Sequence, residues 1–209
     1  MGYTHYWNYK NPVIDLANNT NKKEDIRRTY RGDIEKVKAE IAKLSSHEEL
    51  LKRIKKHTEG FKNIGEELNE ILPKIQQEQG FVLRGGLGEG EPRISENEVW
   101  FNGDGTNDQN LDHETFAIDL FETGNYRRID EFDKEGIFGF CKTAYKPYDF
   151  AVMISLMVIK HHLGSDFSIS SDGGIEEWKD AVEYYEKHFK RSAPKQLKNY
   201  LNKSQTFSN

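Results

Sequence analysis

The sequence predicts an α+β fold, in which an antiparallel β meander packs on a buried central helix and a C-terminal helix, with an N-terminal helical insertion. Three observations lead to this prediction. Residues 22–78 repeat apolar side chains at helical spacing, short β-type runs separated by turn clusters follow Gly80, and residues 148–163 are apolar on almost every side of a helix.

We expect one domain in the 209 residues of the chain. It comprises the helical insertion at about 22–78, an α+β core made of residues 1–12 and about 80–190, and a polar tail over 191–209. The aromatic first segment predicts a short strand of the core.

The insertion is predicted to form two or three antiparallel helices. Its apolar residues recur every three or four positions, and Ser45-Ser46 and Gly60 interrupt the pattern. The simplest role for such helices is a scaffold or an oligomer surface. The first apolar stripe consists of Ile26, Tyr30, Ile34, Val37, Ile41 and Leu44.

After Gly80 the sequence is typical of strands joined by tight turns. Turn clusters at 102–105 and 122–125 separate runs rich in β-branched and aromatic residues. A short apolar run also precedes the turn at 171–174. The predicted strands are 98–101, 114–118, 137–142 and 167–170.

Two helices follow the meander. Pro147 opens the first, which is apolar all round and is therefore predicted to be the buried centre of the domain. The second spans about 175–190, and the chain after Pro194 is predicted to be loosely held. One face of the second helix carries Trp178, Val182, Tyr185 and Phe189.

Composition narrows the function classes. With 35 acidic against 30 basic residues the net charge is −5, which argues against general nucleic-acid binding. One cysteine excludes an internal disulfide framework and a cysteine-rich zinc site. The N-terminus has no apolar signal core, and the longest apolar run, 150–159, is too short to span a membrane. We therefore expect a soluble cytoplasmic protein.

The turn from Ser170 to Gly174 is a candidate anion site. Small residues that leave a strand and enter a helix expose backbone N–H groups at the positive end of the helix dipole. Ser170, Ser171 and Asp172 would then line a ligand. The alternative is a helix start capped by Ser171 or Asp172.

A second candidate is the segment that precedes the buried helix. Lys142 and Lys146 offer charges for a phosphate, while Thr143 and Tyr148 offer hydroxyl groups and an aromatic face. The alternative is a solvated connection with extended lysines. Cys141 lies in an alternating run and is predicted to be a small buried hydrophobe.

Two of the seven histidines lie among strand-like aromatic residues, His5 beside Tyr6 and His113 beside Glu114. Each is a candidate general base or hydrogen-bonding residue. Because no metal-ligand spacing is present, no metal or cofactor is expected. His47, His57 and His188 are predicted to be ordinary surface residues, and His161 and His162 suit a helix C-terminus, where a cation is favoured.

Taken together, these motifs resemble an uncharacterised family of small proteins of tailed bacteriophages and bacteria. The resemblance rests on the N-terminal MGYTHYW, on FNG at 101–103, on HETF at 113–116, on FCKTxxKPYD at 140–149 and on SSDG at 170–173. The stretch 22–78 is longer and more helical than its counterpart in that family. The resemblance implies a phage context, with an infected bacterial cell as the setting, and no established reaction.

In that context, we expect a counter-defence protein that binds and sequesters a nucleotide-derived immune signal, such as a cyclic dinucleotide or a cyclic ADP-ribose derivative. A homo-oligomer is possible through the insertion. The residues expected to bind the ligand are Tyr3, His5, Tyr6, Trp7, Asn102, His113, Lys142, Thr143, Lys146, Tyr148, Ser170, Ser171 and Asp172.

Two alternatives stay open. The chain could be an enzyme that cleaves such a phosphorylated ligand, with His5 or His113 as acid or base and Lys142 stabilising charge. It could instead be an inhibitor that grips a host protein through the helices of 22–78.

Overall fold

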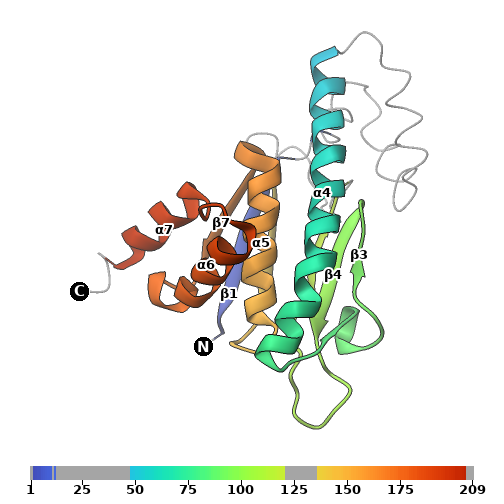
Figure 1. Cartoon of the computed structure of the whole chain (residues 1–209), viewed down its shortest axis with the longest axis vertical. Helices are drawn as coiled ribbons and strands as arrows, with labels where there is room; N and C mark the ends of the chain where they lie inside the picture. Colours follow the sequence, from blue (N-terminus) through green and yellow to red (C-terminus); the bar gives the residue numbers. More distant parts are fainter. Residues whose placement is uncertain (1, 11, 13–47, 121–135, 206–209) are drawn as a thin grey trace.

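The computed structural model describes residues 2–10, 12, 48–120 and 136–205. In these ranges it combines helices with antiparallel strands, which confirms the α+β class. Two helices, α4 (Glu48–Gln79) and α5 (Asp149–Leu163), run side by side in front of the strands (Figure 1).

The first sheet has β1 (Thr4–Tyr9) at its centre. β1 pairs antiparallel with β6 (Ile137–Lys142) on one edge and with β7 (Phe167–Ser171) on the other. The register places His5 opposite both Cys141 and Ser171. The N-terminal segment therefore meets the ends of two strands that are far from it in sequence.

A second sheet is built on β4 (Glu98–Gly103), which pairs with β2 (Leu83–Arg84), β3 (Arg93–Ile94) and β5 (Phe116–Asp119). A short 3-10 turn, η1 (Gly86–Gly88), follows β2. The two sheets are joined where Glu114 meets Lys142. The Glu114 amide donates to the Lys142 carbonyl at 3.3 Å, and the Lys142 amide donates to the Glu114 carboxylate at 2.7 Å.

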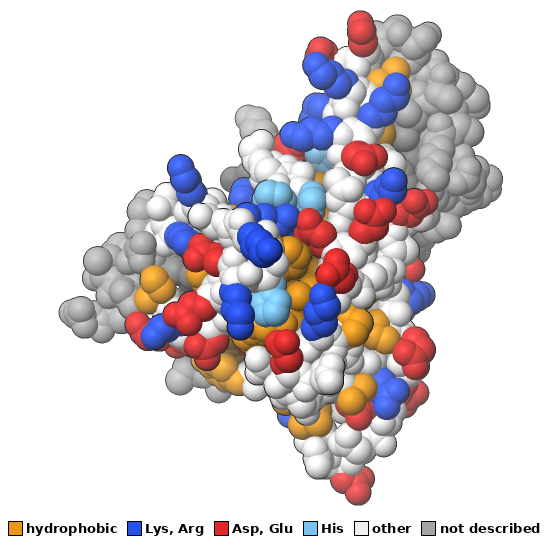
Figure 2. Space-filling model, in the orientation of Figure 1, with side chains coloured by type: hydrophobic (Ala, Val, Ile, Leu, Met, Phe, Trp, Pro, Cys, Tyr) orange, Lys and Arg blue, Asp and Glu red, His pale blue; other side chains and the backbone are white. Residues whose placement is uncertain are grey.

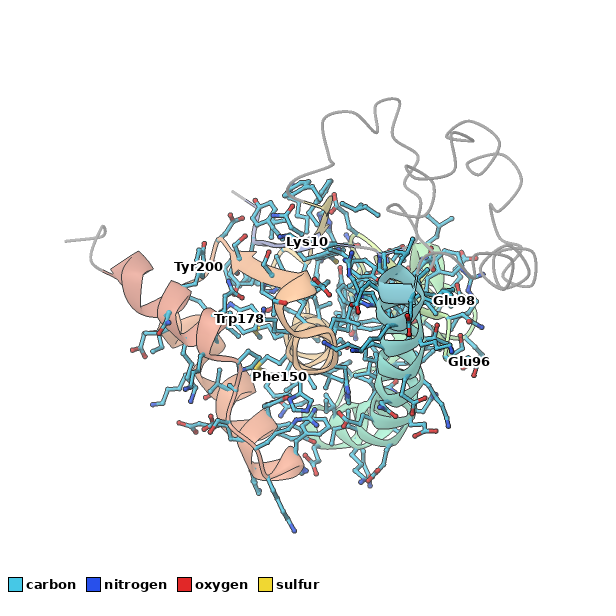
Figure 3. The ribbon with its side chains drawn as sticks, turned by 90° about the horizontal axis from the view of Figure 1, so that it is seen from above. Lys10, Glu96, Glu98, Phe150, Trp178 and Tyr200 are labelled. Atoms are coloured by element: carbon cyan, nitrogen blue, oxygen red, sulfur yellow. The ribbon has the colours of Figure 1, made fainter. Side chains whose placement is uncertain are left out.

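The helix α5 occupies the centre of the molecule. Seen from above, α5 lies between α4 on one side and the C-terminal helices on the other (Figure 3). The strands near Lys10 lie alongside α5 in the same view. Every residue from Ala151 to Ile159 is buried, as the all-round apolar sequence predicts. A second 3-10 turn, η2 (Gly164–Asp166), connects α5 to β7.

The helix α6 (Ile175–Phe189) packs the predicted apolar face, with Trp178 and Tyr185 fully buried. The expectation of a loosely held polar tail after Pro194 was wrong, because α7 (Lys195–Gln205) docks on the edge of β7.

Two side chains of α7 hold this edge. The amide of Gln196 donates to the Ile169 carbonyl at 2.8 Å and accepts from the Ile169 amide at 3.3 Å, and Tyr200 donates to the Ser171 carbonyl. The edge of β7 has no neighbouring strand to pair with. The side-chain amide of Gln196 therefore pairs with its exposed backbone groups instead.

The prediction that Gly60 breaks the helical stretch was also wrong. α4 continues through it, because Gly60 is buried where α4 approaches the end of α5, and an added Cβ would lie 3.3 Å from Leu163. Phe61, Ile64 and Leu68 of α4 belong to the same hydrophobic core as α5 and the strands. Residues 22–47 of the predicted insertion lie outside the described residues.

The helix-covered face carries acidic and basic side chains intermixed (Figure 2). No helix in the described ranges is both long and apolar enough to cross a membrane.

Glu67 of α4 connects this helix to α5 and to the segment that follows α6. The carboxylate of Glu67 accepts hydrogen bonds from both terminal nitrogens of Arg191, at 2.9 and 2.6 Å. His162 Nε2 of α5 lies 3.2 Å from Glu67 Oε1. Burial by itself would raise the pKa of Glu67, but His162 and Arg191 outweigh burial and lower this pKa to about 2.

We predict that Glu67→Gln lowers the free energy of unfolding at pH 7 by about 1–2 kcal/mol, because charge-assisted hydrogen bonds to Arg191 are lost. The folded-state pKa is depressed, so the benefit is full above about pH 4.3 and is lost as pH falls towards about 2. Urea unfolding at several pH values measures this. Glu70→Gln, on the exposed side of α4, is the control. A difference from wild type that stays constant down to pH 2.5 would contradict the prediction.

Candidate functional site

Strand alternation divides the predicted N-terminal residues between two faces of the first sheet. Tyr3, His5 and Trp7 point into the core and are at most 3% exposed. Tyr6 points to the opposite, outer face. Residues that are adjacent in sequence therefore belong to two different environments.

On the inner face His5 is the centre of a buried hydrogen-bonded chain. Its Nε2 lies 2.7 Å from Asp149 Oδ1, at the start of α5, and its Nδ1 lies 3.0 Å from the Ser171 hydroxyl, at the end of β7. The Thr143 hydroxyl donates to the same Asp149 oxygen. This chain joins β1, α5 and β7, and it unites three predicted residues, His5, Thr143 and Ser171.

Two aromatic side chains flank His5 edge-on, with ring centroids 5.0 Å away for Tyr3 and 5.1 Å for Trp178. Trp178 Nε1 has no hydrogen-bond partner among the described residues, whereas the Tyr3 hydroxyl lies beside the Ser171 hydroxyl. Burial raises the pKa of Tyr3, and the Ser171 hydroxyl beside it opposes the rise only in part. Trp178 Nε1 is therefore a buried donor without a described partner next to the chain.

Tyr145 forms the solvent side of this region. Its ring is 65% exposed and stacks on Tyr3 at 4.1 Å. Ala144 and Tyr145 both have positive φ, at 51° and 59°, a conformation that non-glycine residues adopt rarely. The turn after β6 is thus strained, and it sets the Tyr145 ring over Tyr3.

The outer face of the first sheet is aromatic. Tyr6 lies opposite Phe140 in the register, and its ring stacks on Phe138 with centroids 6.0 Å apart. Phe138 is 41% exposed and Phe140 51%. A contiguous group of exposed aromatic rings often marks an interaction surface, whereas single exposed apolar residues do not.

Polar groups border these rings. Ser170 lies opposite Tyr6 on β7, and the Tyr6 hydroxyl donates to Asp172 at 3.0 Å. Lys142, opposite Thr4, continues the outward-facing positions of β6, and no acidic side chain in the described residues forms a salt bridge with it. Four predicted residues, Tyr6, Lys142, Ser170 and Asp172, therefore share the outer face.

The structure assigns the other predicted residues to packing and loop closure. Asn102 is buried and bonds the backbone of His113 at both N–H and C=O, which closes the loop between them. The ring of His113 is exposed and makes no hydrogen bond to a described residue.

Three further predicted residues are also engaged elsewhere. Tyr148 is buried and donates to the Glu114 carbonyl at 2.7 Å, Lys146 donates to the Asn110 carbonyl, and Trp7 packs on Phe116. None of them reaches the His5 chain.

The turn after β7 is a capped helix start. The Asp172 amide donates to the Thr4 carbonyl, the Gly173 amide to the Ser171 hydroxyl, and the Gly174 amide to the Glu177 carboxylate. These three donors already have partners, so the turn is a helix start and not an open anion site, but its N-cap is Gly174 and not Ser171 or Asp172.

The exposure of the side chains tests the predictions made for Cys141 and His57. Cys141 is fully buried, as predicted, and burial raises the pKa of its thiol. His57 was predicted to be a surface residue, but it is 2% exposed, because it faces η2 and stacks on Tyr9. In the described parts of the chain no group of three His, Cys, Asp or Glu side chains could hold a metal ion.

Sequence reasoning missed Asp149 as a partner of His5, and it missed Phe138 and Phe140 as surface residues. The signal for the two phenylalanines was present, because they alternate with the small residues Gly139 and Cys141 on one strand. For Asp149 no local signal existed, since its partner is 144 residues away.

No family model matches the chain, and neither curated proteins nor solved structures give a match.

We predict that Asp149→Ala destabilises the protein by about 3 kcal/mol, because His5 Nε2–H and the Thr143 hydroxyl would be left buried without an acceptor. Chemical denaturation measures the loss. Asp172→Ala, which removes an exposed carboxylate of the outer face, should cost under about 0.5 kcal/mol. Equal stability of the two variants would show that the buried chain does not hold α5.

Proposed function

We propose that the protein captures a phosphorylated, nucleotide-derived signalling molecule on the outer face of the first sheet and holds it without turnover. The observation that carries this proposal is the group of three rings, Tyr6, Phe138 and Phe140, on a sheet face that leaves the two phenylalanines about half exposed. Aromatic side chains on a sheet give purine and pyrimidine bases a stacking surface.

The remaining groups on this face suit the rest of such a ligand. Lys142 provides a positive charge for a phosphate at one end of β6, while Ser170 and the Tyr6 hydroxyl can hydrogen-bond a ribose. A ligand with few phosphates fits better than a long nucleic acid, because the chain carries net charge −5.

Capture is favoured over cleavage of this ligand by the position of the histidines. Both ring nitrogens of His5 are engaged on the inner face, and His113 lies in the loop after β4. The phage context implied by the sequence resemblance supports a counter-defence role, in which removal of an immune signal is sufficient.

The direct experiment incubates the purified chain with cyclic dinucleotides and cyclic ADP-ribose isomers and follows free ligand by chromatography before and after heat denaturation. We expect one ligand to disappear and to return intact on heating. A new product peak would contradict capture, and ligands that all stay free would contradict binding.

We predict that Phe140→Ala weakens binding about tenfold or more, because one base–aromatic stack contributes about 1–3 kcal/mol. Isothermal titration with the ligand found above measures the change. Tyr145→Ala is the matched control, because this ring is also exposed but lies outside the outer face. Equal losses in the two variants would argue against the outer face.

Lys142→Met should likewise weaken binding and reduce its dependence on salt, because one phosphate contact is removed. Lys146→Met is its control, since this lysine is bound to the Asn110 carbonyl. If Lys146→Met has the larger effect, the phosphate does not lie at Lys142.

A further inference from the structure

The inner face holds a second arrangement of reactive groups that ligand capture does not use. It consists of Ser171, His5 and Asp149, in the order hydroxyl, imidazole, carboxylate. This is the arrangement by which enzymes activate a serine as a nucleophile, with a base in hydrogen-bond range and a third group that orients the base.

The direction of each hydrogen bond follows from the partners. An ionised Asp149 can only accept, so Nε2 of His5 carries the proton. In the neutral ring Nδ1 is then an acceptor, and the Ser171 hydroxyl must donate to it. The Gly173 amide donates to the Ser171 oxygen at 3.0 Å, which leaves the hydroxyl hydrogen free for Nδ1. With a neutral His5, the serine proton is therefore directed at a base.

The position of Ser171 in the fold fits the same role. It is the last residue of β7, and the next turn leads directly into α6. Gly173 permits the turn, because a Cβ there would lie 2.3 Å from the Tyr3 hydroxyl. A nucleophile between a strand and a helix is held rigidly by both elements.

Beside the serine and the imidazole lie two neutral donors, the Tyr3 hydroxyl and Trp178 Nε1, of which Trp178 Nε1 has no partner among the described residues. Buried polar groups without partners are rare in folded proteins. Neutral donors next to a nucleophile can stabilise the oxyanion that forms when a carbonyl group is attacked. The charged side chains next to Tyr3 and the turn are Asp149 and Glu177. Both are acidic and would repel a phosphate.

We propose that Ser171 is an activated nucleophile for carboxylic esters, with His5 as its general base and Asp149 as the residue that positions His5. This activity goes beyond ligand capture and uses the opposite face of the sheet. Ser171 Oγ would bond to the carbonyl carbon while its proton moves to His5 Nδ1. The ester C–O bond then breaks and Nδ1–H protonates the leaving oxygen. A water molecule, deprotonated by His5, would release the acid and regenerate Ser171.

The experiment uses phenylmethanesulfonyl fluoride, which sulfonylates an activated serine and releases fluoride, and intact-mass spectrometry as the readout. We expect one adduct per chain on the wild type and none on Ser171→Ala. Ser170→Ala is the matched control, because Ser170 is the neighbouring serine on the outer face, and it should be labelled like the wild type. An unlabelled wild type, or an adduct that persists in Ser171→Ala, would overturn the proposal.

A second variant covers the case in which Ser171→Ala fails to fold. In Ser171→Cys, a thiol hydrogen-bonded to His5 should react with iodoacetamide at position 171, while the buried Cys141 stays unmodified. Adding His5→Gln should slow this alkylation at least tenfold. No alkylation, or an unchanged rate in the double variant, would show that His5 does not activate this position. Binding of nucleotides on the outer face is measured separately with Phe140→Ala, so either proposal can fail alone.

Discussion

The fold depends on one buried residue that has two polar atoms to satisfy. His5 is fully buried, and each of its ring nitrogens requires a partner that the apolar core cannot supply. Asp149 and Ser171 provide them, so the start of α5 and the end of β7 are fixed against the central strand. The helix that fills the core and the turn that begins α6 are both positioned by this chain.

A second constraint is the alternation of the central strand. The first residues of the chain are polar and aromatic throughout, and the sequence predicted that they gather around one ligand. In a strand they cannot, because successive side chains point to opposite faces. Tyr3, His5 and Trp7 join the core, whereas Tyr6 joins Phe138, Phe140 and Ser170 on the outer face. The predicted set of residues thus separates into a buried hydrogen-bonded chain and an exposed aromatic surface.

The sequence predicted correctly those helices and strands whose form depends on local apolar periodicity. The apolar helix at the centre, the strand 137–142 and the apolar face of α6 follow directly from periodicity. The failures have a common cause, since α7, the continuous α4 and the buried His57 all depend on contacts with distant residues. Gln196 docks on Ile169, Gly60 fits against Leu163, and His57 faces Asp166. No local composition reveals such partners, and the same holds for the pairing of His5 with Asp149.

The two faces of the first sheet differ in the chemistry that they can support, and charge decides the difference. The outer face has exposed rings and the ammonium group of Lys142, so an anionic, aromatic ligand can reach it without losing much hydration. The inner face presents the neutral groups of Tyr3 and Trp178 beside the acidic Asp149, so an uncharged carbonyl compound suits Ser171 better than an anionic ligand does. The backbone of β1 separates the two environments by the thickness of one strand. Because its side chains alternate, a ligand on Tyr6 and an ester on Ser171 would not compete for the same atoms.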